Sequence, residues 1–178
     1  MKKNILSMMA AALLVVGLAS CGGSSTIKNY CDDLEDLRML DRDRARDKME
    51  KIETSTVGKE VPMEIDGSAP FKVVKDFSVV RVTPIYGGMD FEGQIEVNDP
   101  DVDVRDYCLV ACDGSKPLKE LPYKTYPFDG VNILELHLNV GNLVFGGEKA
   151  KDEIRNIDRI VITKSDSDLM KELLDADK

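Results

Sequence analysis

Short segments in which hydrophobic and polar residues alternate fill most of the chain after residue 59. Period-two alternation is typical of β-strands with one buried face and one wet face, which is the usual arrangement in antiparallel sheets. Turn residues such as Asp66-Gly67 and Asp113-Gly114 separate the segments. The strands expected from this pattern are 60–65, 71–86, 89–97, 107–112, 118–123, 131–140 and 159–164.

The clearest alternation lies in 89–97 and 131–140, where each strand is expected to have an apolar inward face and a polar outward face. The expected inward residues are Met89, Phe91, Gly93, Ile95 and Val97 in the first strand, and Leu134, Leu136, Leu138 and Val140 in the second. The expected outward residues are Asp90, Glu92, Gln94, Glu96 and Asn98, and then Ile133, Glu135, His137 and Asn139.

Residues 27–53 follow a helical period instead, so the sequence predicts one long N-terminal helix. Asp41 interrupts its apolar stripe, and the helix is expected to bend there or to stand partly away as a membrane-proximal stalk. A third interpretation is that the helix docks on a partner protein. Burial of Leu34, Leu37 and Met49 against the chain's own sheet would exclude that interpretation.

Two shorter helices are expected near the C-terminus, at 148–158 and after the capping signal Ser165-Asp166-Ser167-Asp168. These elements predict a mainly β (or α+β) fold, in which an antiparallel β-sandwich is preceded by a long N-terminal helix and followed by short helices. The chain of 178 residues is too short for two domains of typical size. Residues 54–178 are therefore expected to form a single β-rich domain.

The first twenty residues are of a different kind. Lys2 and Lys3 precede an apolar run that is too short for a membrane span, which is the pattern of a secretory signal peptide. The sequence Leu18-Ala19-Ser20-Cys21 resembles the lipobox of bacterial lipoprotein precursors, over residues 1–21 alone. The resemblance implies removal of residues 1–20 and lipidation of Cys21, with several acyl chains such as palmitate as a stable anchor. Residues 21–26 are expected to be a flexible tether.

This resemblance implies a lipid-anchored location in the cell envelope. Gly22 after Cys21 resembles the pattern of lipoproteins sorted to the outer membrane. The sequence does not specify whether the domain faces the periplasm or the cell surface. The whole chain has a net charge of −9, and removal of Lys2 and Lys3 with the signal leaves 22 basic against 33 acidic residues, or −11. A chain of this charge is not expected to bind nucleic acid.

Three cysteines remain beyond Cys21, and an odd number cannot all pair within one chain. Cys108 and Cys112 lie on one expected strand with their Cα atoms about 13 Å apart, which is beyond the reach of a disulfide. Both are expected to be small buried residues, and Cys31 remains a possible partner for either.

A run of alternating carboxylates is the first candidate site, and it predicts a calcium ion bound by Asp99, Asp101, Asp103 and Asp106. The EF-hand pattern fails there, because Val104 stands where glycine is needed and Val110 where glutamate is needed. A polar loop between two strands explains the same residues. No cofactor other than calcium is expected.

The second candidate site is a cluster of aromatic residues expected in a loop, where Tyr123 and Tyr126 are predicted to contact a partner or a glycan. The alternative is that both rings cover a sheet edge. His137, the single histidine, is expected on a wet face beside Glu135, as a general base or as a plain cross-strand polar residue.

These observations favour a non-catalytic protein with a binding, structural or assembly role in the envelope. We expect a non-catalytic role because the sequence contains no G-x-S-x-G elbow, no phosphate-loop motif and no zinc-finger spacing. The alternative is a periplasmic or surface hydrolase that uses carboxylates, with calcium at the aspartate run. The expected partners are the membrane, through the lipid, and an envelope protein or glycan.

Overall fold

The computed structural model describes residues 22–67, 69–128, 132–141 and 154–176. The expected signal peptide and the lipidation site Cys21 lie outside these ranges, as does most of the helix expected at 148–158. Ile154 and Ile157, at the end of that segment, are described, and both are buried.

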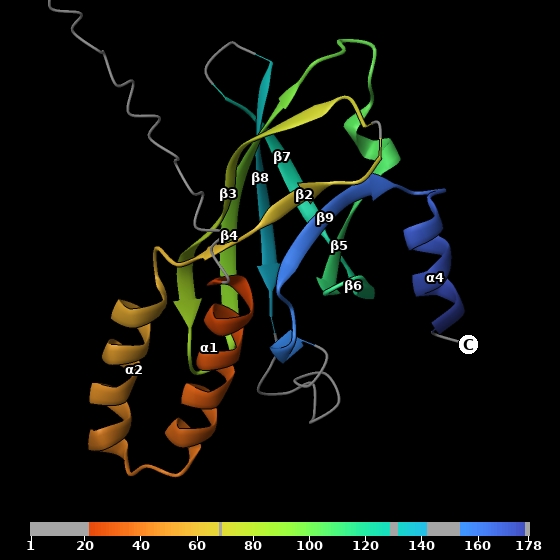
Figure 1. Cartoon of the computed structure of the whole chain (residues 1–178). Coiled ribbons are helices and arrows are strands. Elements are labelled where there is room, and N and C mark those ends of the chain that lie inside the picture. The colour runs from red at the N-terminus through yellow and green to blue at the C-terminus, as the bar shows by residue number, and fades with distance from the viewer. Residues whose placement is uncertain (1–21, 68, 129–131, 142–153, 177–178) are drawn as a thin grey trace, which may run out of the picture.

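Two β-sheets make up most of the described structure, so the prediction of a mainly β protein is confirmed (Figure 1). The first sheet has the order β1-β3-β4-β8-β7, with bounds Glu60–Val61, Phe71–Thr83, Gly88–Val97, Ile133–Val140 and Tyr123–Phe128. The second has the order β2-β9-β5-β6, with bounds Met63–Ile65, Arg159–Lys164, Tyr107–Asp113 and Lys116–Leu121. All pairings in the described sheets are antiparallel except β2 with β9, which is parallel.

The inner faces of both sheets contribute to one hydrophobic core. Phe77 and Leu136 come from the first sheet, Leu109 and Ile160 come from the second, and all four are almost fully buried. Phe71 of β3 and Tyr107 of β5 meet edge to face, with ring centroids 4.6 Å apart. Aromatic contacts of this geometry help to hold the sheets together.

Strands β4 and β8 confirm the predicted alternation. Most of their inward residues are buried, and their outward residues are half-buried or exposed. The strands pair with Glu92 opposite His137, which brings two outward faces together in one sheet. A register of this kind sets which side chains become neighbours.

The single strand expected at 60–65 is wrong, because Pro62 divides it. β1 pairs with β3 in the first sheet, whereas β2 pairs with β9 in the second. Proline has no N–H to donate to a ladder, so it suits the point where the chain leaves one sheet for the other. The Pro62 carbonyl accepts a hydrogen bond from the Ile160 N–H at 2.9 Å.

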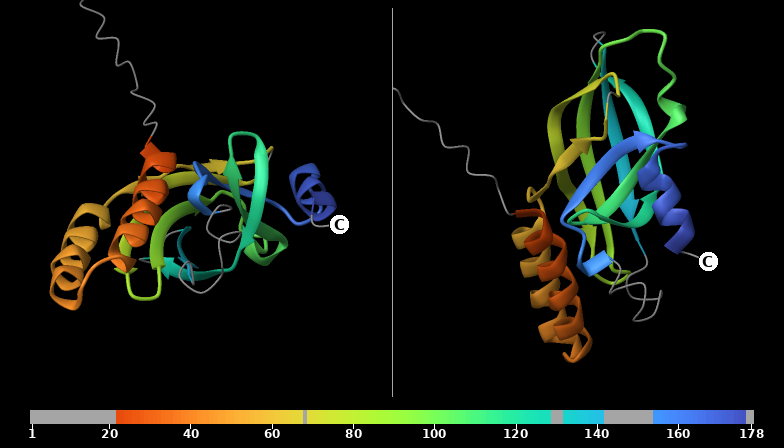
Figure 2. Two further views of the ribbon diagram at one scale, coloured as in Figure 1. Left: turned by 90° about the horizontal axis from the view of Figure 1, so that it is seen from below. Right: turned by 45° about the vertical axis from the view of Figure 1, so that its right-hand side comes forward.

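The single long helix expected over 27–53 is also wrong. The chain forms two helices, α1 (Gly22–Arg38) and α2 (Arg42–Thr56), which lie side by side next to the sheets (Figures 1 and 2). Asp41 caps α2, because its carboxylate accepts a hydrogen bond from the Arg44 N–H at 3.0 Å. Lys48 of α2 forms an ion pair with Asp33 of α1.

Helix α1 belongs to the domain and begins inside the segment expected as a tether over 21–26. The Tyr30 hydroxyl donates to the Gly88 carbonyl at 2.9 Å, which ties the helix to the start of β4. Leu34 is buried in the common core, and Leu37 packs against it. These contacts contradict the stalk and partner-docking interpretations for α1, whereas Met49 of α2 is half-buried and outside the core cluster.

Helix α4 (Asp168–Ala176) lies against the outer face of the second sheet (Figure 1). It begins as predicted, because the Ser167 hydroxyl accepts a hydrogen bond from the Met170 N–H at 3.2 Å. Such a bond satisfies an N–H that has no partner within the helix. Met170 and Leu173 cover Val110 and Cys112. Of the helices in the described ranges, none is long and apolar enough to cross a membrane.

Candidate functional site

The outer face of the first sheet carries a hollow of about 660 Å³. Side chains and backbone of β3, β4, β7 and β8 line it, so it lies on the side of this sheet away from the core. Its lining residues are Val80, Arg81, Asp90, Phe91, Glu92, Pro122, Tyr123, Lys124, Tyr126, His137, Leu138 and Asn139. A hollow of this size is within the range of small-molecule sites.

Polar cross-strand pairs between β4 and β8 form a ladder, of which Asp90, Glu92, His137 and Asn139 line the hollow. Asp90 faces Asn139, and Gln94 faces Glu135, on either side of the pair Glu92 and His137. The Asn139 amide donates to the Asp90 carboxylate, and the Gln94 amide donates to Glu135 Oε2 at 3.5 Å. These bonds hold the side chains in place before any ligand arrives.

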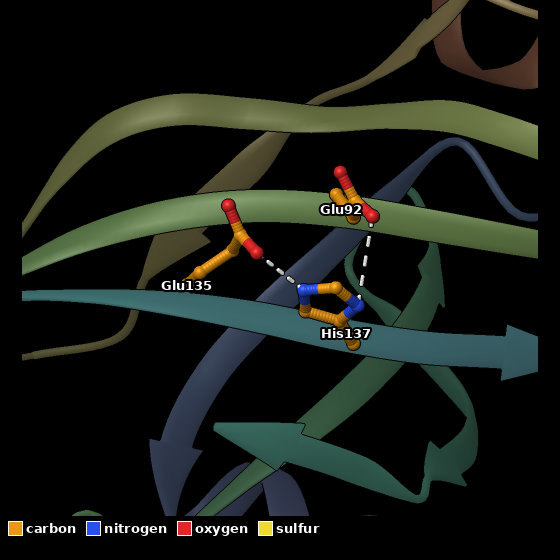
Figure 3. Close-up of side chains that lie close together, drawn as sticks. All are labelled: Glu92, Glu135 and His137. Carbon is orange, nitrogen blue, oxygen red and sulfur yellow. Dashed lines mark hydrogen bonds and ion pairs between the residues drawn. The ribbon is translucent and has the colours of Figure 1, made fainter. Parts of the chain in front are cut away.

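His137 lies between two carboxylates at the centre of this ladder (Figure 3). Its Nε2 is 2.5 Å from Glu135 Oε1, and its Nδ1 is 3.6 Å from Glu92 Oε1. Glu135 precedes it by two positions on β8 and therefore shares its face, while Glu92 comes from the facing position on β4. One donor atom of each residue lies within 4.8 Å of the other two.

The hydrogen bond from His137 lowers the pKa of Glu135, and the Gln94 amide and the nearby charge of Lys75 add to this effect. Each of these groups favours the charged form of the carboxyl group. Glu135 is therefore a carboxylate at neutral pH.

The two candidate tyrosines lie on β7, where a loop was expected, and both line the hollow. The prediction of a loop failed because β7 is the edge strand of its sheet, where Pro127 is tolerated. Tyr126 is 46% exposed, and its ring meets the His137 ring edge to face at 4.8 Å. It is free to contact a ligand in the hollow.

Tyr123 has a different place. Its hydroxyl oxygen lies 2.9 Å from the Val104 carbonyl and 2.8 Å from the Tyr107 carbonyl, so it ties the first sheet to the start of β5. Burial raises the pKa of this phenol to about 12. Tyr123 thus lines the hollow but also packs against the core, and its hydroxyl links the two sheets.

The aspartate run lies in the connection between β4 and β5, with all four side chains exposed. Asp99 accepts a hydrogen bond from the Asp101 N–H at 3.0 Å. Asp103 caps a short 3-10 helix, η1 (Val104–Asp106), and pairs with Arg105, whose hydrogen bonds lower the pKa of Asp103 to about 2. Calcium at Asp99, Asp101, Asp103 and Asp106 stays a prediction.

None of the cysteines that the structure describes is part of a disulfide. Cys31 is buried in α1, Cys112 is buried beneath α4, and Cys108 is half-buried. Burial raises the pKa of Cys108 and of Cys112 to about 11, so neither is an activated nucleophile. Serine, threonine and cysteine are absent from the described lining of the hollow.

Comparison of the chain with protein-family models, with curated proteins and with solved structures finds no match. The site must therefore be interpreted from its own geometry.

Sequence reasoning placed His137 and Glu135 together but did not connect Glu92 with them. The signal was present in part, because both strands alternate clearly and all three residues fall on outward faces. The sequence pattern did not show that β4 pairs with β8, or in which register, because alternation within one strand specifies neither its neighbour nor its register.

Proposed function

We propose that this protein is a lipid-anchored protein of the cell envelope with a non-catalytic binding role, and that its ligand occupies the hollow on the first sheet. In this proposal the two sheets form a β-sandwich scaffold, antiparallel apart from the β2–β9 pairing. The hollow carries the proposal, because it presents pre-positioned polar groups and the exposed ring of Tyr126 on a rigid sheet. Concave sites with a few fixed polar groups are typical of ligand binding.

The anchor part of the proposal is supported by the lipobox resemblance of Leu18-Ala19-Ser20-Cys21. A Cys21→Ser variant should lose acyl groups, seen by mass spectrometry of the intact protein, and should move from the membrane fraction to the soluble fraction. Cys31→Ser is the matched control, because Cys31 is buried in the domain. Acylation that survives in Cys21→Ser would overturn the anchor.

The binding part can be tested by photo-crosslinking in intact envelopes. A photoreactive residue at Lys124 faces the hollow, whereas one at Lys119 lies exposed on β6 of the second sheet. We expect a discrete adduct from position 124, absent from position 119, which Tyr126→Ala weakens. An envelope protein or a glycan would be identified from the adduct. Equal adducts from both positions would contradict a binding role for the hollow.

A second candidate function is carboxylate-based hydrolysis. The observation that favours it is that one carboxylate oxygen of Glu92, which lines the hollow, lies within 4.8 Å of one carboxylate oxygen of Glu135. Glycoside hydrolysis needs one carboxyl group that is protonated before reaction, and the lowered pKa of Glu135 suits a base or nucleophile instead. Glu92 would have to be the acid.

Hydrolysis predicts turnover of chromogenic glycosides or esters that falls at least about 100-fold in Glu92→Gln. No turnover across such a panel, together with a crosslinked partner, would leave binding as the function. The calcium-dependent form predicts that calcium raises the melting temperature, since a ligand that binds only the native state stabilises it. An unchanged melting temperature would remove the aspartate run from consideration.

A further inference from the structure

We propose that Glu92, Glu135 and His137 bind one divalent transition-metal ion, with Zn²⁺ the best match, beside the hollow that Glu92 and His137 line. This inference rests on the proposed binding role of the same hollow, and it adds a metal ion to that binding site. It differs in place and chemistry from the calcium site predicted at the aspartate run.

The geometry brings three donor atoms together from two neighbouring strands. One oxygen of Glu92, one oxygen of Glu135 and one ring nitrogen of His137 all lie within 4.8 Å of one another (Figure 3). Zinc bonds of about 2.0–2.2 Å place tetrahedral ligand atoms about 3.4 Å apart. Binding of one ion therefore requires side-chain rotation, because Glu135 now contacts Nε2 of His137 and Glu92 lies nearer Nδ1.

The donor set selects the class of ion. Imidazole nitrogen combined with carboxylate oxygen suits zinc and neighbouring transition metals, whereas calcium and magnesium prefer oxygen alone. A dication also balances the two carboxylates that now share the single imidazole. The ion would replace the direct 2.5 Å contact between His137 Nε2 and Glu135 Oε1, because both atoms would then bind the ion instead of each other.

Neighbouring side chains hold the three donors in position. Gln94 donates to the second carboxylate oxygen of Glu135, and the Tyr126 ring packs edge-on against the His137 ring at 4.8 Å. Outer contacts of this type orient metal ligands and tune their basicity. Lys75 opposes metal binding, because its positive charge acts on Glu135 and would repel a cation bound there.

Because Glu92 and His137 line the hollow, an ion held by them would have its fourth coordination position beside the hollow. Three protein ligands and an accessible fourth position are typical of zinc sites that bind water or a ligand atom. A bound ion would therefore give an oxygen or nitrogen of the envelope ligand a fixed docking point beside the Tyr126 ring.

Isothermal titration calorimetry of the full-length protein in detergent tests the inference, with Zn²⁺ titrated after treatment with a chelator. We expect one Zn²⁺ per chain, and much weaker heat from Ca²⁺ or Mg²⁺. Glu92→Gln and His137→Ala should each weaken binding at least about 100-fold, since loss of an outer partner alone costs about 10–100-fold. Gln94→Ala should weaken it about 10-fold.

Asp103→Asn is the matched control, because Asp103 is an exposed carboxylate outside the hollow, and its Zn²⁺ affinity should equal that of the unchanged protein. Co²⁺ supplies an independent readout, as its visible absorption should appear on binding and vanish in His137→Ala. Circular dichroism tests whether each variant is folded. If His137→Ala does not fold, the comparison uses Glu92→Gln instead.

Zn²⁺ binding that survives in both Glu92→Gln and His137→Ala would overturn the inference, and so would no binding to the unchanged protein. Crosslinking from position 124 separates this failure from failure of the proposed function. An adduct that persists in chelator leaves the binding role intact and removes the ion alone.

Discussion

The outer faces of the two sheets differ sharply although the inner faces share one core. On the second sheet the outer face is apolar, and α4 covers it with Met170 and Leu173. On the first sheet the outer face is a polar ladder around His137, and it carries the hollow. The second sheet is thus packed on both of its faces, whereas the outer face of the first sheet carries the hollow.

The sequence shows the same difference. Strand β4 alternates between buried and half-buried positions from Met89 to Ile95, whereas β9 has four consecutive buried residues in Ile160–Thr163. Strands with two covered faces become continuously apolar, and strands with one wet face alternate. A covered face and an open face should therefore respond differently to substitution.

The core between the sheets should give the largest effect. Phe77 is a fully buried ring. Phe77→Ala should lower the free energy of unfolding by about 3–5 kcal/mol. Val80→Ala, on the same strand but at the open face, should lower it by less than about 1 kcal/mol. Urea unfolding measures both, and similar losses would mean that the open face is packed after all.

The covered outer face should give the next largest effect. Leu173 packs on the apolar cluster around Val110. Leu173→Ala should lower the free energy of unfolding by about 2 kcal/mol, because it leaves a cavity in that cluster. Leu174 lies on the same helix but is 57% exposed. Leu174→Ala should therefore change the free energy of unfolding by about 0.5 kcal/mol or less.

Urea unfolding of the two helix variants measures this difference. If Leu174→Ala proved as destabilising as Leu173→Ala, α4 would have to lie on the sheet differently.

The thiol beneath α4 predicts a smaller effect that depends on pH. Burial raises the pKa of Cys112 from 9.0 to about 11, so the unfolded chain loses this proton first as pH rises. The contribution to stability is complete below pH 9 and is lost between pH 9 and about 11.

Urea unfolding at pH 8 and pH 10 should show this loss, and Cys112→Ala should reduce it. Iodoacetamide should leave Cys112 unmodified in the native protein at pH 8 and modify it faster in Leu173→Ala. Rapid modification of the native protein would show that α4 does not protect the thiol.

The polar ladder should give the smallest effect on stability. Arg81 Nε lies 2.5 Å from Asp90 Oδ2, but the arginine side chain is 72% exposed. Asp90→Asn should therefore change the free energy of unfolding by less than about 1 kcal/mol, and still less in high salt. Urea unfolding at low and high salt checks this. A larger change would mean that the ladder serves stability more than ligand binding.

Much of the fold follows from local patterns. The alternation of β4 and β8 predicted their faces, and the run around Ser167 predicted the start of α4, because both features depend on residues near each other in the chain. The interruption at Asp41 was visible too, although its consequence was underestimated: α1 has already ended at Arg38, and Asp41 caps a second helix.

The rest depends on contacts between distant segments. Strand β7 forms because β8 supplies a partner for its edge, and the split at Pro62 reflects two different sheets competing for adjacent residues. The cluster at His137 has the same origin, since Glu92 reaches it only through the register of β4 with β8. Neither a strand's neighbours nor its register can be read from its own residues.

The parallel pairing of β2 with β9 has a consequence for how the chain folds. It joins Met63, near the start of the sheets, to Ile160, near the end of the chain, so the second sheet cannot close until nearly the whole polypeptide is available. Pairings between segments so distant in sequence slow folding, because the intervening chain must be ordered first. As the chain emerges during synthesis, therefore, the first sheet can assemble before the second, which must wait for β9.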